Sequence, residues 1–99
     1  MVYKIVKGEL YLRWFRSLRD LKTQAIVLRR LDRFEAGNPG DVKFVGGGVS
    51  EMRIDYGPGY RIYFTQIDGV TYLLLSGGEK RSQQRDIESA IELAKSLRR

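Results

Sequence analysis

The sequence has 99 residues, of which 42% are hydrophobic and 30% are charged. This length predicts one domain spanning residues 1–99, and the composition is typical of a globular protein rather than a disordered one. The absence of cysteine and histidine excludes disulfides, thiolate nucleophiles, histidine-ligated zinc and Ser-His-Asp triads. An enzyme with this sequence must use Lys, Arg, Tyr, Asp and Glu, and we expect it to need no metal or other cofactor.

The formal net charge of +6 indicates which partners the protein would attract. Nucleic acid, the ribosome and acidic proteins are the partner classes that a basic domain of this size favours. No segment approaches the roughly 20 consecutive apolar residues of a membrane-spanning helix, so no membrane association is expected. The lack of cysteine fits a reducing compartment, and we expect a cytoplasmic protein.

The N-terminal part of the chain predicts one strand and two helices. Residues 2–6 form a β-rich run, and residues 10–18 and 21–36 have apolar residues at helical spacing. Asp20 is the expected N-cap of the second helix, whose apolar stripe is predicted as Leu21, Ala25, Leu28 and Leu31. Most of the excess positive charge falls on this helical hairpin, at Arg13, Arg16, Arg19, Lys22, Arg29, Arg30 and Arg33.

The remainder of the chain predicts a loop, a β-meander and a final helix. Residues 37–48 are rich in Gly, Asp and Asn, which favours a flexible surface loop. Alternating strands are expected at 51–56, 60–66 and 70–75, joined by Gly-Pro-Gly and Asp-Gly turns. A third helix is predicted from residue 82 or 83 to the end. The expected fold is α+β: a mostly antiparallel, four-stranded sheet with an N-terminal helical hairpin, a C-terminal helix, and all helices on one face.

Strand alternation predicts a basic and aromatic face on the sheet. Residues two apart on a strand share a face. If the apolar residues of the second and third strands face the helices, then the opposite face carries Arg53, Asp55, Arg61 and Tyr63. Lys80 and Arg81 follow the last strand and would bend toward this surface, while Tyr56 and Tyr60 flank the tight turn. Cations with interleaved aromatic rings suit phosphates and unpaired bases of RNA.

This face has the cationic groups for RNA cleavage by the 2′-hydroxyl of the RNA itself. Such a reaction needs a base for the hydroxyl, cations for the phosphate and an acid for the leaving oxygen. Arg53 and Arg61 suit the phosphate because the guanidinium group meets two oxygens at once. Lys80 could supply charge or a proton, and the candidates for the base are Tyr63, Glu79 and Asp86. The alternative is a solvated polar sheet face without function.

Residues 51–64 resemble the core of toxins of the RelE/ParE family, and most of all a short subgroup described as addiction module killer proteins. The resemblance rests on the motif Arg-x-x-x-Gly-Pro-Gly-Tyr-Arg-x-Tyr, which runs here from Arg53 to Tyr63. A second motif, Gly-Gly-Glu-Lys followed by Gln and Asp-Ile, occupies residues 77–80, 83 and 86–87. The order of the elements also matches, so the resemblance covers nearly the whole chain.

The resemblance implies the toxin of a type II toxin–antitoxin system, which cleaves mRNA in the ribosomal A site and so inhibits translation. It implies catalytic roles for Arg61, Lys80 and Arg53, and the predicted RNA contacts are Tyr56, Tyr60, Tyr63, Arg81 and Gln83. The expected partners are a helix-turn-helix antitoxin, the ribosome and mRNA. Many RNA-cleaving relatives have a late catalytic tyrosine or histidine, which the last 18 residues here lack. Two alternatives therefore stay open: a non-catalytic inhibitor of DNA gyrase, and a plain nucleic-acid-binding module.

Overall fold

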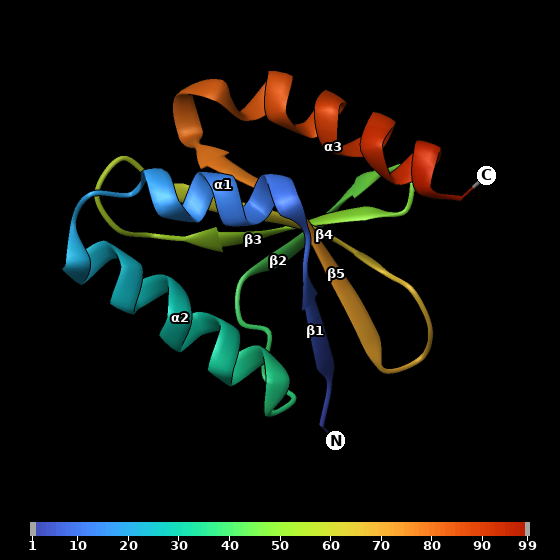
Figure 1. Ribbon diagram of the computed structural model, residues 1–99, viewed down its shortest axis with the longest axis horizontal. Helices are drawn as coiled ribbons and strands as arrows, with labels where there is room; N and C mark the ends of the chain where they lie inside the picture. The colour runs from blue at the N-terminus through green and yellow to red at the C-terminus, as the bar shows by residue number, and fades with distance from the viewer. Residues whose placement is uncertain (1, 99) are drawn as a thin grey trace.

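The computed structural model describes residues 2–98. Strand β1 (Lys4–Lys7) leads into helices α1 (Glu9–Ser17) and α2 (Leu21–Glu35), which form the predicted N-terminal hairpin (Figure 1). Four strands follow: β2 (Val42–Gly46), β3 (Val49–Ile54), β4 (Tyr60–Gln66) and β5 (Thr71–Glu79). A short 3-10 helix, η1 (Lys80–Ser82), then precedes helix α3 (Gln83–Leu97). None of the helices within residues 2–98 has the length and apolar character needed to cross a bilayer.

The strands form one five-stranded sheet in the order β1-β5-β4-β3-β2. Strand β1 is parallel to β5, and the other neighbours are antiparallel. The α+β fold is therefore confirmed, but with five strands rather than four. The additional strand, β2, lies within residues 37–48, which their content of Gly, Asp and Asn predicts to be a loop. The glycines at 46–48 form the turn into β3. Its backbone pairs with β3 at the sheet edge, and composition does not reveal such pairing.

Helices cover both faces of the sheet, so the prediction that all helices lie on one face is wrong. One core lies between the hairpin and the sheet, and its buried residues include Tyr11, Val27, Leu31, Phe34, Met52, Ile62, Phe64 and Leu74. A second core lies under α3 and contains Val49, Tyr63, Leu75, Ala90 and Ala94. Strands β4 and β5 contribute to both cores because adjacent apolar residues, such as Leu74 and Leu75, point to opposite faces.

The buried stripe of α2 differs from the predicted one. Leu21 and Leu28 remain 79% and 42% exposed, whereas Val27, Leu31 and Phe34 are buried. The predicted N-cap is confirmed: the carboxylate of Asp20 accepts hydrogen bonds from the Lys22 backbone N–H and the Thr23 hydroxyl. The apolar residues of this helix cover more than one face, so spacing alone did not identify the face that meets the sheet.

The glycines at the end of β5 allow two helices to approach the sheet from opposite sides. A Cβ atom at Gly77 would overlap the indole ring of Trp14 in α1. A Cβ atom at Gly78 would overlap the carboxylate of Asp86 in α3. Helix α1 and the beginning of α3 therefore pack against adjacent residues of β5, next to the site described below.

We expect Gly77→Ala to lower the free energy of unfolding by about 1–3 kcal/mol, the usual cost of overpacking a core. Trp14 must move to accommodate the new methyl group, and it contacts core residues that cannot all follow. Gly69→Ala is the matched control because a Cβ atom there meets nothing within 4 Å. Urea denaturation of both variants measures the difference, and equal stabilities would contradict the packing described here.

Candidate functional site

A polar hollow of about 380 Å³ lies beside the turn between β3 and β4. The hollow is lined by Asp41, Arg53, Ile54, Asp55, Gly59, Arg61 and Lys80. It therefore brings together the three basic residues predicted to be catalytic. It also contains the carboxylates of Asp41 and Asp55, to which the sequence analysis assigned no role. Among residues 2–98, no acidic cluster is arranged to hold a metal ion.

Arg53 and Arg61 are directly opposite each other on β3 and β4. Like charges in this position destabilise a sheet unless other groups compensate them. Each arginine has its own carboxylate: Arg53 Nη2 lies 2.8 Å from Asp41 Oδ1, and Arg61 Nε lies 3.9 Å from Glu51 Oε2. The first pair is partly exposed, whereas the Glu51 side chain is fully buried and that of Arg61 is 11% exposed. Two arginines of different exposure thus share one hollow.

The carbonyl oxygen of Gly59 joins three parts of the site. It accepts a hydrogen bond from Arg61 Nη1 at 3.0 Å and another from the Lys80 backbone N–H at 2.8 Å. Gly59 has a φ of +80°, which favours glycine, and a Cβ atom there would lie 3.1 Å from Arg61 Nη1. The Gly-Pro-Gly turn thus sets the position of Lys80 relative to Arg61.

The two carboxylates of the hollow differ in their surroundings. Asp41 accepts two hydrogen bonds from the Arg53 guanidinium, and these bonds lower the pKa of the carboxyl. Asp55 is exposed and makes no hydrogen bond or ion pair with residues 2–98. A carboxylate bound to an arginine is a poor proton acceptor because its charge is already compensated. Of the two, Asp55 is therefore better suited to accept a proton.

Tyr63 does not belong to the open face, and the prediction that it faces solvent is wrong. It is fully buried in the core beneath α3, which covers this part of the sheet. Burial raises the pKa of its phenol, and the nearby carboxylates of Glu51 and Asp86 raise it further. A buried phenol of this kind neither stacks on a base nor removes a proton from a hydroxyl near pH 7.

The other predicted RNA contacts also lie outside the hollow. Tyr56 and Tyr60 are half-buried and pack against the hairpin-side core, where the Tyr60 ring meets Trp14. Arg81 is exposed and pairs with Glu79, while Gln83 donates to the carboxylate of Glu51. Thus only the three cations of the predicted set line this hollow.

The two remaining candidates for the general base are engaged elsewhere. Glu79 lies 3.3 Å from Arg81 Nε, and Asp86 accepts a hydrogen bond from the hydroxyl of Ser82. Neither residue lines the polar hollow. Their positions at the end of β5 and the start of α3 follow from the chain order, but the direction of their side chains does not.

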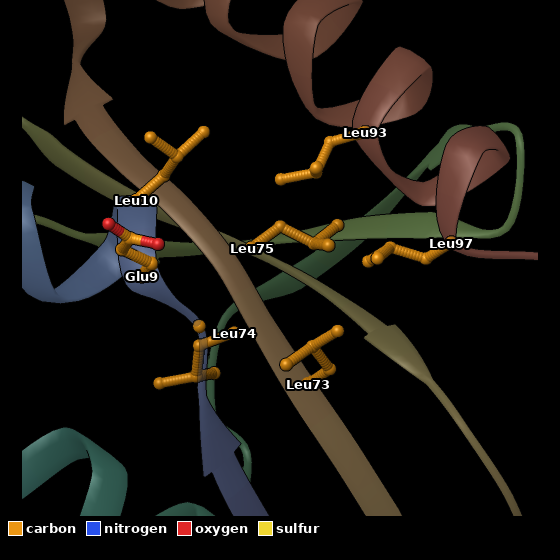
Figure 2. A pocket seen from close by; sticks show the side chains of 8 residues that line it. Glu9, Leu10, Leu73, Leu74, Leu75, Leu93 and Leu97 are labelled. Atoms are coloured by element: carbon orange, nitrogen blue, oxygen red, sulfur yellow. The ribbon is translucent and has the colours of Figure 1, made fainter.

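A second hollow of about 310 Å³ has a different character (Figure 2). It lies between the beginning of α1, strand β5 and the end of α3, and Leu93 and Leu97 extend toward Leu73 and Leu75. Its lining is almost entirely apolar, and among residues 2–98 Glu9 is the only titratable side chain that lines it. This hollow offers no groups for chemistry on a phosphate, whereas the polar hollow combines three cations with two carboxylates and is therefore the candidate active site.

We expect Arg53→Gln to raise the pKa of Asp41 toward its ordinary value of 3.8, because the hydrogen bonds from Arg53 favour the charged form. NMR titration of the side-chain carboxyl carbons measures this change. Asp68 is the internal control, since the backbone N–H groups of Val70 and Thr71 lower its pKa independently of Arg53. A carboxyl group whose pKa is lowered by folding stabilises the folded state at pH values above its ordinary pKa. This stabilisation is lost as the pH falls through the lowered pKa. The stability difference between wild type and variant should therefore shrink below about pH 4, and an unchanged Asp41 titration would contradict the pairing.

Comparisons with known proteins agree with this fold. The family model described as phage-derived protein Gp49-like (DUF891) matches residues 13–99. An uncharacterized protein of Haemophilus influenzae is 43% identical over 84 residues, which cover 85% of each chain. A mutant of the E. coli toxin RelE in the free state superposes with a TM-score of 0.69 at 19% identity, covering 92% of this chain and 95% of that one. The protein therefore belongs to the Gp49-like family and has the RelE fold that its motifs predicted.

Proposed function

We propose that this protein is the toxin of a type II toxin–antitoxin pair and that it cleaves mRNA on the ribosome. The observation that carries this proposal is the polar hollow, in which Arg61 and Lys80 lie beside an unpaired carboxylate, Asp55. The likeness in fold to RelE, which is a toxin, supports the class. The basic charge of the whole chain suits both the ribosome and an acidic antitoxin segment. Such a pair would act in the cytoplasm.

Arg61 and Lys80 are the groups that would hold the scissile phosphate. Arg61 uses Nη1 for the Gly59 carbonyl, and its Nη2 makes no hydrogen bond with residues 2–98. Lys80 is exposed, and its ammonium forms no ion pair within the same residues. These two cations can bind phosphate oxygens without breaking an existing contact. Arg53 already directs Nε and Nη2 to Asp41, whose carboxylate competes with the phosphate, so we assign it to substrate binding rather than to the bond-breaking step.

The chemistry requires one base, one acid and compensation of charge on the phosphate. Asp55 takes the proton of the 2′-hydroxyl while the 2′-oxygen forms a bond to the adjacent phosphorus. The bond from phosphorus to the 5′-oxygen of the next nucleotide breaks, and Lys80 gives a proton to that oxygen. The products are a 2′,3′-cyclic phosphate and a 5′-hydroxyl end. Arg61 compensates the charge that develops on the non-bridging oxygens.

We expect Arg61→Ala and Lys80→Ala each to lower the rate of mRNA cleavage by about 10²-fold or more, in line with the loss of one preorganised donor. The assay is mapping of mRNA 5′ ends in a purified translation system and in cells expressing the protein. Arg29→Ala is the matched control, because this substitution removes the same charge from an exposed position on the hairpin. Intact messages in the presence of growth arrest would contradict the proposal.

We expect Asp55→Asn to lower the rate constant of cleavage by about 10²–10⁴-fold, the range for loss of a general base. The same change should leave RNA affinity equal or higher, because it removes a negative charge from the phosphate site. Single-turnover cleavage and fluorescence anisotropy with labelled RNA measure the two effects. A variant that cleaves at the wild-type rate would remove Asp55 from the reaction.

The exposed basic surface of the hairpin favours a second candidate, inhibition of DNA gyrase without catalysis. Arg16, Arg19, Arg29 and Arg33 are all exposed on α1, α2 or the turn between them. A negatively charged complex of enzyme and DNA would attract this surface whether or not the hollow is functional. A supercoiling assay with the purified protein distinguishes the two functions, and in that assay Arg29→Ala rather than Arg61→Ala would weaken the effect.

A further inference from the structure

Glu51 is a fully buried carboxylate in the sheet, located between the hollow and α3. Its two oxygens both accept from the side-chain amide of Gln83, at 3.0 Å each, and Oε2 lies 3.9 Å from Arg61 Nε. Removing a carboxylate from water is costly, and well-packed apolar residues often stabilise a core equally well. The charge at this position therefore does not serve stability alone.

The contacts of Arg61 show what this charge does. One nitrogen of the guanidinium, Nη1, donates to the Gly59 carbonyl, and Nε faces the carboxylate of Glu51. Arg53 lies directly across the strand pair and repels the same guanidinium. The attraction to Glu51 on one side and the bond to Gly59 on the other leave Nη2 free. The guanidinium is thus held by one hydrogen bond, at Nη1, and by the charge of Glu51 near Nε, which is buried and makes no hydrogen bond of its own with residues 2–98.

Gln83 connects this arrangement to α3. It is the first residue of that helix and is half-buried. Its side-chain amide donates to the Glu51 carboxylate from the side of the sheet that α3 covers. The neighbouring Gln84 is exposed and bonds instead to Glu88 on the same helix. The two glutamines thus differ in role despite their adjacency, and only Gln83 lies in the chain of contacts that leads to Arg61.

We propose that Glu51 and Gln83 are positioning residues that hold the Arg61 guanidinium toward the hollow, so that the geometry of the site depends on the first turn of α3. This inference rests on the proposed function, since Arg61 is taken as the phosphate-binding group. Neither positioning residue lines the hollow, so neither is assigned a contact with the substrate. Glu51 acts through its charge, and Gln83 acts by fixing the orientation of that carboxylate.

The first test observes Arg61 directly and does not need any activity. In ¹⁵N-labelled protein, the Nε–H signal of Arg61 is assigned by its loss in Arg61→Lys. We expect Glu51→Gln to increase the exchange of this proton with water at least tenfold and to lower its heteronuclear NOE. The Nε–H signal of Arg53, which is bonded to Asp41, is the internal reference and should not change. An unchanged Arg61 signal in the folded variant would overturn the proposal.

The second test separates positioning from binding. Glu51→Gln should lower the single-turnover rate of mRNA cleavage at least tenfold while RNA affinity changes less than threefold, because the phosphate-binding groups are all present. Gln83→Ala should shift both the Arg61 signal and the rate in the same direction, and Gln84→Ala is its matched control. Gln83→Ala also keeps the proposal testable if Glu51→Gln fails to fold. Equal effects of the two glutamine variants would overturn it.

The two proposals fail in different ways. If the wild-type protein cleaves no RNA, the proposed function is wrong, and the Arg61 signal still decides whether Glu51 positions that side chain. If the wild-type protein cleaves RNA and the signal and rate of Glu51→Gln match those of the wild type, the function holds and the positioning role is wrong.

Discussion

Two arginines directly opposite each other on adjacent strands are the constraint on which the site depends. Arg53 and Arg61 repel each other, and the sheet tolerates them because separate carboxylates compensate each charge. The compensation is unequal. Asp41 holds Arg53 at the partly exposed rim, where a phosphate can replace it, whereas Glu51 holds Arg61 from within the protein. For the function we propose, this difference gives one arginine suited to capturing the substrate and another suited to a fixed position.

The C-terminal helix determines which part of the sheet remains available. It covers Tyr63 and Leu75 and so converts most of one sheet face into a second core. The hollow lies near the β3–β4 turn, where Gly59 orients both Arg61 and Lys80. The glycines at the end of β5 bring α1 and α3 close to the same edge. Gly78, against which α3 packs, is paired with Arg61 on β4, and this pairing connects the packing of α3 to the site.

The sequence predicted most helices and strands, and the grouping of Arg53, Arg61 and Lys80, better than it predicted what surrounds them. Alternation along β3 and β4 correctly placed Met52 and Ile62 against the hairpin and assigned Arg53 and Arg61 to the other face. It did not reveal that α3 would cover that other face, because an apolar stripe on a helix does not state which side of a sheet it meets. Strand β2 was missed because the surrounding glycines favour a loop and because, at the sheet edge, none of its residues is fully buried. The role of Glu51 was missed because a lone carboxylate within a strand looks the same whether it faces water or a helix.

The most direct test of the account is a structure of the protein bound to a ribosome with mRNA whose A-site codon carries 2′-deoxyribose, which prevents cleavage. The account predicts that the phosphate following the deoxyribose lies within hydrogen-bond distance of both Arg61 Nη2 and Lys80 Nζ. It also predicts that α3 remains packed on the sheet. A complex in which the hairpin surface contacts the RNA while the hollow faces solvent would contradict it.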